Sequence, residues 1–402
     1  MSGRPCHANP AIATLTLAVA LLGGCQAGSQ PGRPTGHTSG APASLPANVD
    51  PIPLTSGDCL RRRPSAVKVI AGDVAGSFRD DAPTDGTTID ARTASFRDDG
   101  MVGTSGTAMI YPLLLGKKQP AQGVCVVGGS VPGTLDRTMT WPQLKAEVPQ
   151  RDGRRVYFDA AALTEFARGD GTHLVDGLRV DNVGDGVAAR GSFQARRALP
   201  LDGGGFGLRD AYFTFVHDDC VDVNDLGAGV VFDSLLDGCY TGFSERPDSK
   251  SPLLSYHQPR GSNLVIDHVL VRMTPFPGPH PTPHCRAGTA AGYNEMFKWS
   301  PNANPPVVQD SVFLLEAAPC STRYFPFPKH STLSRVTIVW AGHGRWRWGR
   351  PRGVRITSDR RVWDRARTDW LQRHGCTSVA AGLASTTNVC LRLTEPSSLP
   401  KT

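Results

Sequence analysis

The chain has 402 residues, 20 % of them charged, and a formal net charge of +7 at pH 7. A positive net charge alone is compatible with nucleic acid as a partner. The distribution of the charge along the chain is therefore needed to judge which partner it favours. Once an N-terminal targeting segment and a tether are set aside, about 350 residues remain, which exceeds a typical compact domain and suits one elongated repeat domain.

The N-terminus has the features of an export signal. Arg4 provides a weakly positive start, and 11–22 is an apolar run too short to cross a bilayer as a helix. The run ends in Leu22-Gly23-Gly24-Cys25, which resembles the lipobox of bacterial lipoproteins. The resemblance implies cleavage before Cys25, lipidation of its thiol, and an exported lipoprotein of the outer membrane or cell surface. An ordinary secretory signal followed by a chance cysteine is the alternative.

We therefore expect a signal peptide over 1–24, a flexible tether over 25–50 and one folded domain over 51–402. The tether is rich in Gly, Pro, Ser and Thr and has no apolar period, so it cannot bury enough surface to fold. Apart from Cys6 and Cys25, eight cysteines remain, an even number that suits disulfides in an oxidising compartment. The sequence has no CxxC pair, so we do not expect zinc binding by the cysteines.

Short apolar runs with alternating residues follow one another through the folded domain. The clearest are 174–180, 211–216, 229–236, 263–272, 306–316 and 332–340. No long helical period separates them, which disfavours a βαβ sheet. Similar polar turns follow three runs, at Asp185, Asp218 and Asp237, with steps of 33 and 19 residues. Unequal steps around a fixed strand-turn signature predict an all-β fold, a right-handed parallel β-helix, with a β-sandwich as the alternative. An aspartate also lies within or directly beside four of these runs (Asp210, Asp233, Asp267 and Asp310).

The C-terminal part differs in composition. Residues 355–375 predict an amphipathic helix, with Ser358 as cap, an apolar stripe that includes Trp363 and Trp370, and a following Gly375. We expect this helix to cover the open edge of the last coil. Residues 345–373 hold ten arginines and three aspartates, a local charge of +7. This tryptophan-rich basic segment either binds an anionic polymer or forms a packed cap with solvated arginines.

One motif points to chemistry. Residues 217–224 read His-Asp-Asp-Cys-Val-Asp-Val-Asn, which resembles the signature of polygalacturonases and related glycoside hydrolases of the pectate-lyase-like β-helix fold. In that family the paired carboxylates are catalytic, and an aspartate one coil earlier completes the set. The resemblance thus implies catalytic roles for Asp218, Asp219 and Asp185, which lies in a looser Asn-x-x-Asp-Gly segment. It also implies a disulfide between Cys220 and Cys239 in the next coil.

The residues themselves support more than one interpretation of this motif. Crowding of like charge at Asp218 and Asp219 raises one pKa, so that one carboxyl can act as an acid while Asp185 acts as the opposing base. Alternatively, the aspartates bond backbone groups at tight bends, or a set of four binds Ca²⁺. That set would be Asp218, Asp219, Asp222 and Asp225.

Five further residues are predicted to bind substrate: His217, Glu245, Arg246, Lys298 and Trp299. Two functions remain open. The chain is a monomeric enzyme that cleaves an extracellular polysaccharide, by hydrolysis or by elimination, or it is a surface lipoprotein that binds a glycan or another partner without catalysis. We expect no cofactor other than calcium in the lyase alternative, no nucleic-acid partner, and contact with the membrane through the lipid anchor alone.

Overall fold

The computed structural model describes residues 64–377 and 389–390, apart from 76, 98–107, 110, 120, 134–149, 152–153, 158–160, 168–172, 192–205, 224–227, 247–262, 278–290, 318–319 and 343. The chain divides into Met1–Ala47 and Asn48–Thr402, and every described residue lies in the second unit. The predicted signal peptide and the whole of the predicted tether, which begins with Cys25, lie outside the described residues. No helix in the described part is long and apolar enough to span a membrane.

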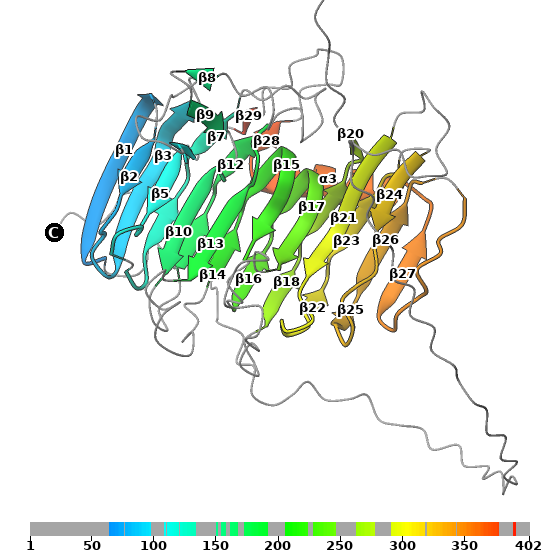
Figure 1. Ribbon diagram of the computed structural model, residues 1–402. Coiled ribbons are helices and arrows are strands. Elements are labelled where there is room, and N and C mark those ends of the chain that lie inside the picture. The colour runs from blue at the N-terminus through cyan, green and yellow to red at the C-terminus, as the bar shows by residue number, and fades with distance from the viewer. Residues whose placement is uncertain are drawn as a thin grey trace, which may run out of the picture. The chain divides into compact units, whose positions relative to one another are not determined.

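In the described part of the chain, twenty-four strands form one sheet, and all of them except β20 wind around a core in three parallel ladders (Figure 1). The first ladder contains β1 (Ala66–Ala75), β3 (Thr87–Arg97), β6 (Cys125–Val127), β11 (His173–Asp176), β14 (Phe206–Arg209), β16 (Gly229–Phe232), β18 (Leu264–Asp267), β22 (Val307–Gln309) and β25 (Thr332–Ser334). The second contains the later parts of β1 and β3, then β7 (Ser130–Pro132), β12 (Arg179–Asp181), β15 (Tyr212–Asp222), β17 (Leu235–Glu245), β19 (Leu270–Met273), β23 (Val312–Leu315), β26 (Val336–Trp340) and β27 (Val354–Thr357).

The third ladder contains β2 (Phe78–Asp80), β5 (Leu113–Leu115), β10 (Leu163–Ala167), β13 (Val187–Gly191), the ends of β15 and β17, β21 (Ala291–Trp299) and β24 (Cys320–Tyr324). Short additional strands are β4 (Ala108–Met109), β8 (Gln150–Arg151), β9 (Arg154–Tyr157), β20 (Phe276–Pro277), β28 (Cys376–Thr377) and β29 (Val389–Cys390). The right-handed parallel β-helix predicted from the sequence is therefore confirmed.

The core consists of side chains stacked from coil to coil. In the first ladder the stack runs through Ile89, Val126, Val175, Leu208, Val231, Ile266 and Val308, all almost completely buried. In the third ladder Phe243 stacks on Phe297 with their ring centroids 5.5 Å apart. Because side chains alternate between the two faces of a strand, every second residue of the predicted runs enters the core and the rest face outward.

Three of the four aspartates noted in the predicted runs lie at bends rather than within strands, whereas Asp267 ends β18. Asp210, Asp233 and Asp310 have φ values of 48°, 38° and 48°, and each separates a first-ladder strand from a second-ladder strand. His268, with φ 56°, occupies the same place after Asp267. Aspartate adopts this left-handed conformation more readily than most residues. The repeated feature of this chain is therefore the bend between the first two ladders.

The C-terminal helix α3 (Arg361–Arg373) packs on a side of the β-helix. It starts after Arg360 rather than at Ser358, and it makes no side-chain cap hydrogen bond. Its buried residues Trp363 and Trp370 contact outward-facing side chains of the second ladder: Tyr212, Leu235, Leu270, Leu314 and Val339. The expectation that this helix covers the last coil was wrong. An apolar face on the second ladder offers more surface to bury than the edge of one strand.

His374, at the end of α3, joins the helix to two bend residues. Its Nδ1 lies 2.6 Å from Asp210 Oδ1, and its Nε2 lies 3.3 Å from Asp233 Oδ2. Burial alone would lower the pKa of His374, but hydrogen bonds to Asp210 and Asp233 raise it to about 9. The imidazolium therefore stabilises the folded state at neutral pH.

This pair of contacts predicts a pH dependence. A folded-state pKa above the unfolded value gives stability that is complete below about pH 6.5 and is lost as the pH rises to about 9. With allowance for partial exposure, we expect the wild type to lose about 1–2 kcal/mol more than His374→Gln between pH 6 and pH 9.5. Urea denaturation at both pH values measures this difference. An equal loss in the two proteins would contradict it.

Candidate active site

The aspartate pair lies where β15 passes from the second ladder to the third. Residues 212–214 pair in the second ladder and 219–222 in the third, and the register shifts between Val216 and Asp219. Phe215, with φ 52°, starts this corner. Consecutive residues of a regular strand point to opposite faces, but a bulge removes that constraint. The corner is therefore the bend that lets Asp218 and Asp219 act together.

Asp185 reaches the pair from the preceding coil. Asp218 donates its backbone N–H to Gly184 O at 2.8 Å, and Asp219 donates its own to Asp185 Oδ1 at 3.0 Å. Gly186 permits this approach, because a Cβ at that position would lie 2.4 Å from Cys220 O. One carboxylate oxygen from each of Asp185, Asp218 and Asp219 lies within 4.8 Å of the others. The three residues named from the sequence motif thus form one cluster.

Lys298 joins the two aspartates from two strands away. Strands β15, β17 and β21 are neighbours in the third ladder, with Asp222, Ser244 and Lys298 in register. The Lys298 ammonium bonds Asp219 Oδ1 at 2.6 Å and also bonds Asp218 Oδ1. It lies 5.6 Å from the ring centroid of Tyr240. A lysine is long enough to cross the intervening strand, so it ties three coils together.

The electrostatics of the cluster keep Lys298 charged. Burial alone would lower the pKa of Lys298, but the Asp219 and Asp218 carboxylates raise it well above its ordinary value. Among the three side chains, Asp218 is the most accessible at 21 % exposed, against 7 % for Asp219 and 11 % for Lys298. An incoming ligand would therefore meet Asp218 first.

In the calcium alternative, Lys298 already occupies the position that the cation would take. The ammonium already bonds both aspartates, so Ca²⁺ on the same oxygens would have to displace it. Asp222, another member of the proposed calcium set, is 2 % exposed, and Asp225 lies outside the described residues.

The other residues predicted to bind substrate lie in different surroundings. His217 is 2 % exposed, and its Nε2 lies 2.9 Å from Asn182 Oδ1. Glu245 is buried, whereas Arg246 is exposed. Trp299 lies in register with Glu245, packs against the core, and donates its indole N–H to Asn304 O at 3.1 Å. Lys298, the fifth of these residues, bonds two members of the carboxylate cluster.

The predicted disulfide between Cys220 and Cys239 is confirmed, with a Cα–Cα distance of 5.7 Å. Both side chains are completely buried, so the bond links two coils directly behind the aspartate pair. Cys125 and Cys376 are also disulfide-bonded, and Cys376 lies opposite Cys390 in the β28–β29 pair. The similar turns at Asp218 and Asp237 do not occupy equivalent positions in successive coils, since Asp237 lies opposite Thr214.

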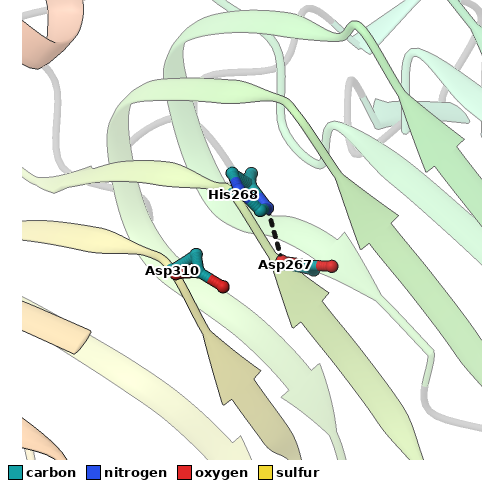
Figure 2. A group of neighbouring side chains, drawn as sticks. All are labelled: Asp267, His268 and Asp310. Atoms are coloured by element: carbon teal, nitrogen blue, oxygen red, sulfur yellow. Dashed lines mark hydrogen bonds and ion pairs between the residues drawn. The ribbon is translucent and has the colours of Figure 1, made fainter. Parts of the chain in front are cut away.

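A second group of possible metal ligands lies at the bends, where the side chains of Asp267, His268 and Asp310 gather (Figure 2). His268 Nδ1 lies 2.6 Å from Asp267 Oδ1. Arg335, the bend residue of the next coil, bonds both oxygens of Asp310 at 2.5 Å and lowers its pKa. Its guanidinium supplies the positive charge that a metal would bring. The gathering of Asp267, His268 and Asp310 is therefore explained by the stacking of bends in successive coils.

The sequence placed Lys298 among substrate contacts but missed its ion pairs with the aspartates. Its alternation with the core residue Phe297 shows that it faces outward, yet the pairing of β21 with β17 depends on the long, variable loops between them. Comparisons of the chain with family models, curated proteins and solved structures gave no match.

Proposed function

We propose that this chain is an exported carbohydrate-active protein that hydrolyses a glycosidic bond of an extracellular polysaccharide at Asp185, Asp218 and Asp219. The observation that carries the proposal is the convergence of these three carboxylates from two neighbouring coils. Glycoside hydrolysis needs one carboxyl group to donate a proton to the leaving oxygen and a second to assist the attack on the anomeric carbon. The resemblance of residues 217–224 to the polygalacturonase signature supports the same assignment.

Within this proposal Asp218 is the acid, because it is the most accessible of the pair. It protonates the oxygen of the scissile bond, while a carboxylate of Asp219 or Asp185 assists the attack on the anomeric carbon, and water supplies the hydroxyl group of the new reducing end and returns one proton to the carboxylates. Lys298 positions Asp218 and Asp219 through its ion pairs with both carboxylates. The products are two shorter chains, one of which carries a new reducing end.

The spacing of the carboxylates bears on the stereochemistry of cleavage. In inverting enzymes the acid and the opposing base, here Asp185, stand ~6.5–9.5 Å apart. The oxygens instead approach within 4.8 Å of one another, so inversion is not part of the proposal. The anomer first released, observed by NMR, decides between the two outcomes.

The proposed exported location combines two observations. The segment ending in Cys25 has lipobox character, and the buried Cys220–Cys239 bond belongs to a class that persists in oxidising compartments. A lipidated Cys25 would hold the enzyme at the outer membrane or cell surface, close to polysaccharides outside the cell.

Asp218→Asn provides the test. On a polysaccharide that the wild type cleaves, we expect turnover to fall by about 10²–10⁴-fold, because the proton donor is lost while the side chain keeps its size. A panel of polysaccharides assayed for new reducing ends identifies the substrate first. Asp369→Asn, a change at an exposed position on α3, is the control and should leave turnover unchanged.

The possible outcomes separate the alternatives. Full activity of Asp218→Asn would move the active site elsewhere. Unsaturated products that disappear with EDTA would indicate calcium-dependent elimination instead. Binding of a polysaccharide without any product would indicate a non-catalytic glycan-binding lipoprotein.

A further inference from the structure

The connection between β26 and β27, together with the start of β27, forms a basic surface. Five arginines in this region are exposed, and we call them the arginine cap: Arg345, Arg347, Arg350, Arg352 and Arg355. The sequence from 341 to 358 contains no acidic residue. No ion pair joins any of the five to a described carboxylate, so their charges remain uncompensated within that part of the chain.

Other exposed arginines of this chain behave differently. Arg335 pairs with Asp310 at 2.5 Å, Arg360 with Glu316 at 3.1 Å, and Arg361 with Asp359 at 2.9 Å. Intramolecular pairing is therefore common for exposed arginines near the C-terminus, and the arginine cap departs from it. Clustered like charges repel one another, and a bound polyanion would relieve that repulsion.

The arginines stand on a packed platform. Trp340, Trp346 and Trp348 lie against one another with ring centroids 4.8–5.8 Å apart. Trp340 donates its indole N–H to Gly344 O at 2.8 Å, and Trp348 packs against the core residue Phe325 with a centroid distance of 5.2 Å. This packing fixes the segment, so ordering it costs little when a ligand binds.

We propose that the arginine cap binds an anionic polysaccharide. Charge complementarity requires a polyanion, and the half-buried faces of Trp346 and Trp348 between the arginines can stack on sugar rings. The disulfides place the chain in an oxidising compartment, which favours a glycan over nucleic acid. The large exposed apolar side chains in the described part are Val67 and Val69 of β1, so the cap offers no wedge for a membrane.

This proposal goes beyond the proposed hydrolase function and does not depend on it, because binding is measured without cleavage. The test uses the mature chain carrying Asp218→Asn, with polygalacturonate and heparin as anionic probes and dextran as the neutral one. We expect both anionic probes to bind, dextran not to bind, and the affinity to fall about 10-fold or more between 50 and 200 mM NaCl through release of counterions.

Two triple variants with equal loss of charge give the decisive comparison. R345Q/R347Q/R350Q should lose about 10-fold or more of the affinity for both anionic probes, because it removes uncompensated charge. R335Q/R360Q/R361Q removes three paired arginines and should stay within about twofold of the parent. R345K/R347K/R350K should retain most of the affinity, which shows that the platform is intact.

Three outcomes would overturn the proposal. The first is equal weakening by the two glutamine variants, which would mean that net charge alone is responsible. The second is unchanged binding when the arginine cap is altered. The third is tighter binding of a 20-base-pair DNA duplex, or of phosphatidylglycerol vesicles, than of either anionic polysaccharide.

Discussion

Replacing Lys298 with methionine is expected to lower the free energy of unfolding at pH 7 by about 3 kcal/mol. Methionine keeps the length of the side chain and removes the ammonium that bonds Asp218 and Asp219. Two neighbouring carboxylates then repel each other in a poorly solvated corner. The value lies at the lower end for a broken buried ion pair because Asp218 is 21 % exposed.

The cause of this loss can be isolated with a compensating variant. Lys298→Met combined with Asp218→Asn and Asp219→Asn removes the repulsion and should recover most of the stability. The penalty of Lys298→Met should also shrink near pH 4, because protonation of a carboxyl removes its charge. Chemical denaturation at both pH values gives the measurement. A change below about 0.5 kcal/mol at pH 7 would show that the ion pairs contribute nothing in solution.

The sequence motif predicted the members of the carboxylate cluster because they lie close together along the chain. Asp218, Asp219 and Cys220 follow one another, and Cys239 comes one short coil later, so a local pattern contained the information. Asp185 needed only the preceding coil. Lys298 joins the same cluster across 79 residues from Asp219, and no local pattern encodes how loops of variable length bring its strand into register.

The bends were the second feature that the sequence left open. The alternation of apolar and polar residues predicted which side chains enter the core. This alternation is not interrupted at a residue with left-handed backbone conformation, so it does not show where a strand ends. The run 263–272 therefore looked like one strand, whereas the structure has β18, a bend at His268, and β19. The aspartates at equivalent places were visible in the sequence, and their tolerance of positive φ was the signal that could have identified the bends.

The position of α3 shows why an amphipathic pattern predicts a helix but not the surface on which the helix packs. The stripe through Trp363 and Trp370 correctly predicted a helix with one buried face. Its target is a set of apolar side chains that face outward from successive strands of the second ladder. In the sequence these residues alternate with core residues just as solvent-facing positions do, so only the assembled ladder reveals them as a second apolar surface.

Trp370→Ala is expected to weaken the attachment of α3 by about 3–5 kcal/mol. The side chain is completely buried, stacks on His374 at 4.1 Å between ring centroids, and donates its indole N–H to Asp233 O at 3.2 Å. The β-helix has its own core, so the helix should open locally while the strands stay folded. Hydrogen exchange should therefore accelerate strongly in the amides of α3 and little in β16.

Two further variants separate packing from hydrogen bonding at this position. Trp370→Phe keeps an aromatic ring and loses the bond to Asp233 O, so it should cost about 1 kcal/mol for that bond plus a smaller packing loss. Asp369→Ala, at the exposed neighbouring position, should stay within about 0.5 kcal/mol of the wild type. Uniform acceleration of exchange across α3 and the strands in Trp370→Ala would contradict local opening. It would mean that the helix and the β-helix unfold as one cooperative unit, with Trp370 supporting the stability of both.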